Sequence, residues 1–197
     1  MKGGYILVSE LSGQTNILIK AEEMGLKLEK GSSEALNILT QVKDLEQAGY
    51  SFEAAGGSLE LLIRRELGDC DRAWSLDEYH CSFRQYQDRQ RPVCEATVKL
   101  VVEQQKAYTV AEGHGVVNAL DKALRRALVP FFPEIEGVSL VDYKVRILDS
   151  EEATASKTRV LIVHSDGEST WGTVGVSDSI IEASWIALND GIDLFLQ

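Results

Sequence analysis

Long apolar runs, metal-binding cysteine pairs and a secretion signal are all missing from this 197-residue sequence. It contains no uninterrupted run of about 18 apolar residues, which argues against a membrane-spanning helix. Cys70, Cys81 and Cys94 form no CxxC pair, so the sequence supports neither a zinc ribbon nor a thioredoxin-like redox site. The apolar run at residues 5–8 is too short for a signal peptide. We therefore expect a cytoplasmic protein whose thiols are reduced.

Positive charge is also scarce, because 31 acidic residues outweigh 20 basic ones and give a net charge of −11. Such a chain repels nucleic acids and anionic membranes, which excludes them as expected partners. The only basic cluster is Lys122, Arg125 and Arg126 on a predicted helix, and we interpret it, together with Asp121, as a solvated face. With 44% hydrophobic residues, the chain can still bury the core of an ordinary globular protein.

Three short helices are predicted in a helical linker subdomain at residues 1–72. Each begins at a serine and ends at a glycine, which are typical capping residues, and the expected spans are 12–25, 32–49 and 58–68. The stripe expected to be buried in the second helix is Leu36, Leu39, Val42, Leu45 and Ala48. A polar break at residues 69–75 marks the expected boundary, and a second domain follows at residues 76–197.

A sequence repeat organises this second domain. Residues 116–124 (VVNALDKAL) are echoed by residues 180–188 (IIEASWIAL), and each copy follows a series of strand-like runs. The first round predicts strands at 80–86, 95–102 and 106–111, a turn at 104–105, and a helix at 115–128. The second round predicts strands at 140–148, 157–165 and 169–176, and a helix at 178–188. The expected fold class is α+β, with the helical subdomain followed by two pseudo-symmetric βββα units.

The last predicted helix is apolar on nearly every side. A helix of this kind must be buried all round, and a domain this small has little room to do that alone. A second subunit is therefore the expected cover, and the amino-terminal helical subdomain is the alternative.

Several separate motifs resemble the regulatory domain of the citramalate synthase and 2-isopropylmalate synthase family. They lie at residues 110–124, 142–149 and 171–185. Residues 9–16 and 49–55 resemble the linker subdomains of the same enzymes, closer to the citramalate branch. The resemblance covers nearly the whole chain. It implies a regulatory homodimer that binds a branched-chain amino acid and that is joined to a catalytic TIM barrel in the parent protein.

The catalytic part of that family is not visible in this sequence. Family enzymes condense acetyl-CoA with a 2-oxo acid in a TIM barrel that holds a divalent metal through a His-x-His pair and an acidic residue. Here His80, His114 and His164 are too dispersed for such a pair, and a barrel does not fit beside the repeat. The chain thus resembles the carboxy-terminal part of a citramalate synthase, truncated or expressed separately. The metal and acetyl-CoA would belong to the barrel, and the parent enzyme would be an acyltransferase.

No catalytic residue is assigned in this chain. The family's linker normally helps to complete the partner subunit's active site through an aromatic residue shortly after its Ser-Gly-x-x-Asn motif. This sequence has Ile19 where a tyrosine is expected. We therefore expect no activity from the chain alone and assign it no metal ligand.

The loop before the first repeat helix is a candidate effector site. Gly113-His114-Gly115 leads into a helix whose first backbone N–H groups lack acceptors and favour an anion such as a carboxylate. Gly-x-Gly is also common as a simple tight turn. Carried over from the family residue by residue, the effector pocket falls on Gly113, Gly115, Val117, Asn118, Leu140, Tyr143, Ile147 and Val176.

The function implied by the resemblance is feedback inhibition of a citramalate synthase-like enzyme of isoleucine biosynthesis, with isoleucine as the effector. Three alternatives stay open. The chain could belong to a leucine-regulated 2-isopropylmalate synthase, since a shifted methyl group changes affinity by only ~1–3 kcal/mol. It could be a structural dimer without an effector. Its helical subdomain could also complete a barrel active site supplied by another polypeptide.

Overall fold

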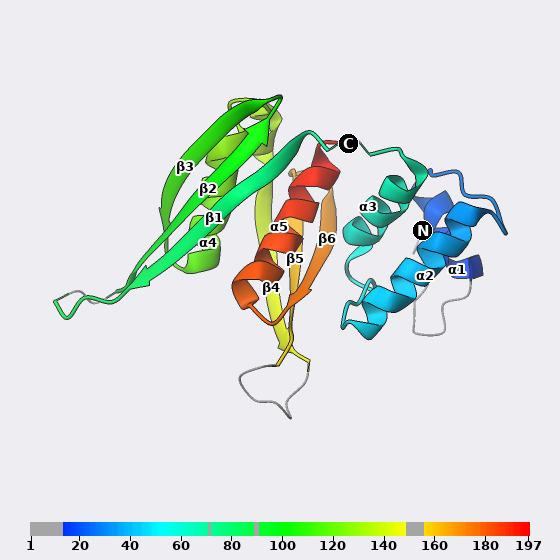
Figure 1. Ribbon diagram of the computed structural model, residues 1–197, viewed down its shortest axis with the longest axis horizontal. Coiled ribbons are helices and arrows are strands. Elements are labelled where there is room, and N and C mark those ends of the chain that lie inside the picture. Colours follow the sequence, from blue (N-terminus) through cyan, green and yellow to red (C-terminus); the bar gives the residue numbers. More distant parts are fainter. Residues whose placement is uncertain (1–13, 71, 89–90, 149–155) are drawn as a thin grey trace.

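The computed structural model describes residues 14–70, 72–88, 91–148 and 156–197 (Figure 1). The helical part comprises α1 (Gln14–Glu23), α2 (Ser33–Gln47) and α3 (Gly56–Leu67). The first repeat comprises β1 (Trp74–Arg84), β2 (Val93–Val102), β3 (Gln105–Gly113) and α4 (Val116–Leu128). After a short 3₁₀ helix, η1 (Pro133–Gly137), the second repeat comprises β4 (Ser139–Ile147), β5 (Thr158–Ser165), β6 (Thr170–Ser177) and α5 (Ile180–Phe195). The predicted α+β fold with two βββα units is confirmed.

The two sheets have the same topology and the same irregularity. Each is antiparallel, with strand orders β1-β2-β3 and β4-β5-β6. The β1–β2 register shifts between Leu76 and Glu78, and the β4–β5 register shifts between Leu140 and Asp142. These pairs are 64 residues apart, which is also the offset between Val116 and Ile180. A bulge retained at equivalent positions shows that the repeat extends through the strands.

A side-chain hydrogen bond repeats with the same offset. Thr109 in β3 donates its hydroxyl to the carbonyl of Ala123 in α4 at 2.6 Å. Thr173 in β6 donates its hydroxyl to the carbonyl of Ala187 in α5 at 2.7 Å. Each bond ties the last strand of a unit to its own helix, so the sequence repeat is also a repeat in three dimensions.

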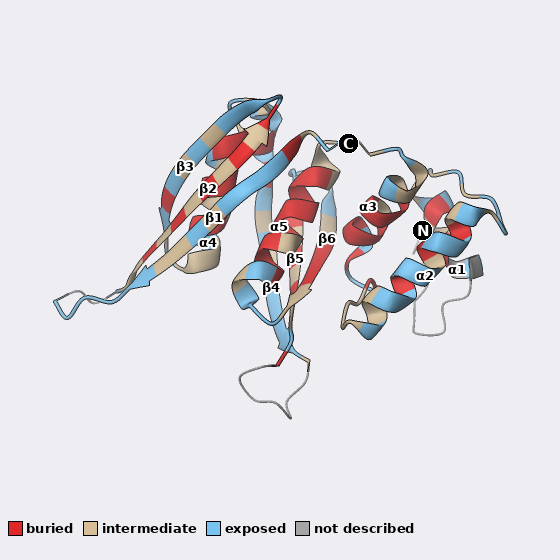
Figure 2. Ribbon diagram, in the orientation of Figure 1, coloured by how far each residue is buried: buried red, intermediate tan, exposed pale blue. Residues whose placement is uncertain are grey.

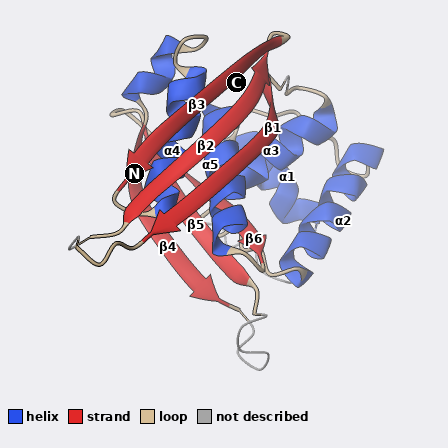
Figure 3. Ribbon diagram, turned by 60° about the vertical axis from the view of Figure 1, so that its left-hand side comes forward, coloured by secondary structure: helices blue, strands red, loops and turns tan. Residues whose placement is uncertain are grey.

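The helices α4 and α5 lie between the two sheets (Figures 1 and 3). One hydrophobic core joins them, because residues such as Val98 of β2, Leu124 of α4 and Ile162 of β5 belong to the same buried cluster. The alternating burial along β2 reflects this arrangement, with one face of the strand on the helices and the other face outward. The two repeats therefore form one packed unit.

The helical subdomain packs on the outer face of the second sheet, and its helix α3 lies along the β6 edge, where it contacts both β6 and α5 (Figure 1). A second cluster joins Ile17 of α1, Ile38 of α2 and Leu59 of α3 to Val174 of β6. The predicted stripe of α2 was wrong at Leu36, which is 52% exposed. The buried residues of α2 are instead Ala35, Ile38 and Val42. The proposed division of the chain at residues 69–75 stays a prediction.

After its exposed first turn, the helix α5 is largely buried within this single chain from Ala183 to Asp193, as Figure 2 shows. Ser58 of α3 donates a hydrogen bond to the Asp190 carboxylate at 2.8 Å, and Trp185 contacts Trp74 and Tyr79 of β1. The inference that α5 needs a second subunit as its cover was therefore wrong. The helical subdomain, together with both sheets, provides the cover.

Several predicted boundaries were displaced, most of all for β1, which was predicted at 80–86 and lies at Trp74–Arg84, so that it begins inside the predicted polar break. The hairpin turn between β2 and β3 lies at Glu103 and Gln104, both with positive φ, one residue before its predicted place. The helix α5 continues seven residues past Leu188, because its polar residues are paired with α3 rather than with water. The part of the first predicted helix before Gln14 lies outside the described residues. Of the helices in the described part of the chain, none is long and apolar enough to cross a membrane.

Candidate functional site

A cavity of about 440 Å³ lies between α4 of the first repeat and β4 of the second. Its volume falls within the range that is usual for small-molecule sites. Four of the predicted effector residues line it together: Val117 and Asn118 from the first turn of α4, and Leu140 and Tyr143 from β4. The fold thus brings residues more than 20 positions apart into one pocket at the seam of the two repeats.

An ion pair forms the polar wall of this cavity. Arg125 donates from Nε to the Asp121 carboxylate at 2.8 Å and from Nη1 to the Val138 carbonyl at 2.6 Å. The two side chains are only 14% and 16% exposed, so the interpretation of Asp121 and Arg125 as a solvated face was wrong. Burial raises the pKa of the Asp121 carboxyl, although the Arg125 guanidinium opposes this effect. The cavity therefore offers a carboxylate and a guanidinium within one turn of α4.

One donor of this wall has no acceptor. The Nη2 atom of Arg125 is buried without a hydrogen-bond partner among the described residues. An unsatisfied buried donor costs about 1–3 kcal/mol, and more when the group is charged. Because this atom has almost no exposed surface, a ligand in the cavity would reach it only if the Arg125 side chain moved.

The hydroxyl of Tyr143 links the cavity to α5. It lies 2.9 Å from the hydroxyl of Ser184, which donates its own proton to the Ile180 carbonyl at 2.6 Å. Since the only proton of Ser184 is used in that bond, Tyr143 is the donor between the two hydroxyls. The lone pairs of the Tyr143 oxygen remain available as acceptors.

The amino end of α4 is open at the lip of the cavity. Its N-cap is Gly115, which has no side chain to accept from the first N–H groups, and the first helical bond runs from the Ala119 N–H to the Gly115 carbonyl. The free N–H groups and the helix dipole favour a negative charge at this end. Gly113 lets β3 approach closely, since a Cβ there would overlap the backbone nitrogen of Ala119.

Two predicted effector residues lie elsewhere. Ile147 is at the end of β4 and is 65% exposed, and it does not line the cavity. Val176 lies beside Gly49, at the connection between α2 and α3. Val176 therefore does not line the α4–β4 cavity.

Sequence reasoning missed the lining residues Asp121, Arg125, Val138 and Ser139. Asp121 and Arg125 were treated as surface because acid–base pairs four residues apart are usually solvated. Their positions in the helix could have indicated burial. Helical spacing places residues 121 and 125 on the same face as the apolar residues 117, 124 and 128. Val138 and Ser139 carried no motif.

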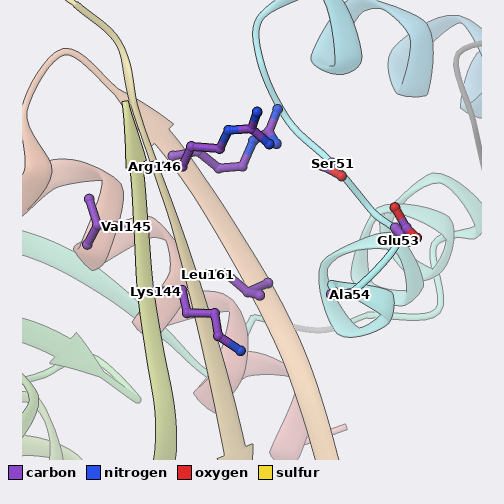
Figure 4. Close-up of a pocket in the computed structure, with 8 residues that line it drawn as sticks. Ser51, Glu53, Ala54, Lys144, Val145, Arg146 and Leu161 are labelled. Atoms are coloured by element: carbon purple, nitrogen blue, oxygen red, sulfur yellow. The ribbon is translucent and has the colours of Figure 1, made fainter. Parts of the chain in front are cut away.

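A larger cavity of about 720 Å³ lies on the other side of the second sheet. Figure 4 shows Lys144 and Arg146 on the sheet wall, and Ser51 and Glu53 on the connection that faces it. It contains none of the predicted effector residues, and its sheet wall is cationic. In the described ranges, no group of three acidic, histidine or cysteine side chains is arranged to hold a metal ion.

The sequence pattern of the LeuA allosteric (dimerisation) domain matches residues 53–196, which is most of the chain and includes both repeats and the cavity. The chain belongs to this family. The (R)-citramalate synthases of Aquifex aeolicus and Geobacter sulfurreducens are 45% and 46% identical over 187 and 192 residues, or 95% and 98% of this chain. The 2-isopropylmalate synthase of Aquifex aeolicus is 28% identical over 190 residues, or 95% of the chain.

This LeuA-family chain spans about a third of the length of those relatives, namely 35%, 36% and 33% in the same order. The match is stronger to the citramalate synthases than to the isopropylmalate synthase. The resemblance seen in the sequence is therefore confirmed, including its tendency toward the citramalate branch.

Proposed function

We propose that the chain is the regulatory part of a citramalate synthase-like enzyme and that its α4–β4 cavity binds isoleucine as a feedback inhibitor. The observation that carries this proposal is the cavity itself, which combines opposite charges with aliphatic walls. A free aliphatic amino acid needs a partner for its ammonium group, a partner for its carboxylate and an apolar space for its side chain.

Each requirement has a matching group in the cavity. The Asp121 carboxylate and the Tyr143 oxygen accept from the ammonium group. The free N–H groups at the open amino end of α4 receive the carboxylate, and Arg125 holds the Asp121 carboxylate in place at 2.8 Å. Val117, Val138 and Leu140 face the aliphatic side chain. This arrangement differs from the larger cavity, whose sheet wall offers Lys144, Arg146 and Arg159.

The ligand's site also suggests how binding is transmitted. Tyr143 joins β4 to Ser184 of α5, and α5 carries Asp190, which is bonded to Ser58 and Arg65 of α3. A ligand that prefers one position of α4 against β4 therefore acts on the helix that holds the linker subdomain. Inhibition requires different affinities for two such arrangements, because binding alone shifts no equilibrium.

The same proposal includes a cytoplasmic homodimer joined to a catalytic barrel that condenses acetyl-CoA with pyruvate. Two edge strands support the dimer, because β1 exposes Phe83 and β4 exposes Val141, Val145 and Ile147. Exposed apolar side chains on sheet edges are typical of interfaces. Sedimentation of the purified chain tests this part, with a dimer expected and a monomer at all concentrations as the contrary result.

Calorimetric titration tests effector binding. Isoleucine is expected to release or absorb heat with a submillimolar Kd, and leucine is expected to bind more weakly. Replacing Asp121→Asn is expected to weaken binding by roughly 10–100-fold, since hydrogen bonds to charged groups contribute about 1.5–3 kcal/mol. Arg146→Gln, which alters only the larger cavity, is the matched control and should leave binding unchanged. If neither isoleucine nor leucine produced heat at millimolar concentrations, the proposal would be refuted.

A further inference from the structure

The repeat offset pairs the walls of the α4–β4 cavity with a second set of residues. Asp121, Val138 and Tyr143 line the open cavity. Their counterparts 64 positions away are Trp185, Trp74 and Tyr79, in the same order. We call the place where β4 meets α4 the first seam. The counterparts lie at its pseudo-symmetric equivalent, the second seam, where β1 of the first repeat meets α5 of the second.

At this second place Trp185 contacts both of the other side chains. The ring of Tyr79 stacks on Trp185 with centroids 5.0 Å apart, and Trp74 meets Trp185 edge-on with centroids 6.1 Å apart. Both indoles are buried. Where the first seam has a small aspartate beside a cavity, the second seam has an indole in the corresponding space.

The polar end of the second seam is closed as well. The counterpart of Gly115 is Ser179, whose hydroxyl accepts from the Glu182 backbone N–H and so caps α5. The counterpart of Asn118 is Glu182, whose carboxylate accepts from the Ser177 hydroxyl at 2.6 Å. An acid at this end repels a ligand carboxylate, whereas the uncapped end of α4 attracts one.

We infer that each chain contains two pseudo-equivalent amino-acid pockets, of which one is open and the other is permanently filled by the indole of Trp185. This inference rests on the proposed function for the identity of the ligand at the open pocket. It assigns Trp185 the part of a built-in occupant, which seats α5 against β1 at all times. A bound amino acid would do the same for α4 against β4, so only the α4 seam responds to the effector. Each chain then binds one effector molecule.

Two variants test the closed pocket. Trp185→Ala removes the indole, and we expect it to bind free indole, which the unaltered chain does not bind at the same concentration. A multiple variant, Ser179→Gly, Glu182→Asn, Trp185→Asp, Asn189→Arg and Trp74→Val, gives the second seam the counterparts of Gly115, Asn118, Asp121, Arg125 and Val138. Calorimetry with isoleucine is expected to show one site per chain in the unaltered protein and two in the multiple variant. Trp171→Ala, which removes a tryptophan outside both seams, is the control and should keep one site.

The results separate this inference from the proposed function. If isoleucine fails to bind the unaltered chain, the proposed effector is wrong, and indole binding to Trp185→Ala still decides whether a closed pocket exists. Two isoleucine sites in the unaltered chain, or no indole binding to a folded Trp185→Ala variant, would overturn the inference. If Trp185→Ala does not fold, Trp185→Leu serves the same comparison, because a smaller side chain still vacates part of the pocket.

Discussion

Tyr143 donates a hydrogen bond to Ser184 across the seam between the second sheet and α5, with 2.9 Å between the two hydroxyl oxygens. Tyr143 lines the α4–β4 cavity, whereas Ser184 belongs to the helix on which the linker subdomain is docked. This single bond therefore connects the proposed effector pocket to the element through which a regulatory change would leave the domain.

Replacing Tyr143→Phe tests this connection. The variant removes one hydrogen bond of about 1 kcal/mol, so we expect a comparable loss of unfolding free energy and roughly fivefold weaker isoleucine binding. Chemical denaturation and calorimetry measure the two effects. Tyr79→Phe is the matched control, since Tyr79 is the pseudo-equivalent residue at the filled seam. An equal loss of isoleucine affinity in both variants would argue against a direct role for the Tyr143 hydroxyl.

Gly113→Ala should destabilise the first repeat. The added Cβ would lie 2.8 Å from the Cα of Ala119 and still closer to its backbone nitrogen, and a helix backbone has little freedom to move aside. Strain of this kind costs about 1–3 kcal/mol, which denaturant unfolding detects. Gly137→Ala is the control, because a Cβ at that position meets nothing within 4 Å. Equal stability of the two variants would show that the close approach of β3 to α4 is not required.

Ser58→Ala should loosen the linker subdomain from α5. The Ser58 hydroxyl donates to Asp190 and accepts from the Val174 N–H at 3.0 Å, and both contacts are buried. Its removal leaves two buried groups without this partner, so we expect a loss of about 2–3 kcal/mol and a fall in Tm of roughly 4–12 °C. Ser33→Ala, at an exposed site on α2, should change Tm far less. A Tm that is unaltered by Ser58→Ala would show that this contact does not hold the subdomain.

The buried His164 predicts a pH dependence of stability. Burial lowers its pKa from 6.5 to about 4, and the nearby Arg125 guanidinium adds to this effect. The unfolded chain therefore takes up a proton below pH 6.5 that the folded chain refuses until about pH 4. The stability contributed by neutral His164 is complete above pH 6.5 and falls with pH, with about 2 kcal/mol lost by pH 5.

The measurement for His164 is a difference between variants. Burial raises the pKa of Asp190 and Asp193, and these carboxyls contribute the opposite pH trend. Unfolding free energies of the unaltered chain and of His164→Gln, measured from pH 7 to pH 5, isolate the histidine. We expect the difference between the two to change by about 2 kcal/mol. Parallel curves would mean that His164 is protonated equally in both states.

The periodic parts of the structure were predictable from the sequence, and the contacts between elements were less so. Five of the six strands and the helix α4 follow from alternation, helical periodicity and the Gly115 start. The sixth strand, β1, was predicted to begin at His80 but begins at Trp74. The end of α5 did not follow. The helix was predicted to end at Leu188, because Asn189, Asp190 and Gly191 do not continue its apolar pattern. These residues stay helical since Ser58 and Arg65 satisfy the Asp190 carboxylate, and His164 lies against Gly191.

The candidate site was predicted in part for the same reason. Val117, Asn118, Leu140 and Tyr143 were identified by the family resemblance, and the fold brings them together. Asp121 and Arg125 were assigned to the surface, because an acid–base pair on a helix carries no sign of what covers it. Only the packing of β4 against α4 turns this pair into the wall of a cavity.

Nitrogen-15 NMR mapping of isoleucine on the labelled chain tests the central claim most directly, because it locates the bound ligand. We expect the largest shifts at the backbone amides of Val117, Asn118 and Tyr143, a smaller shift at Ser184, and none at Ser51 or Arg159 of the larger cavity. Shifts centred on Ser51 and Arg159, or an unchanged spectrum at millimolar isoleucine, would contradict an effector site between α4 and β4.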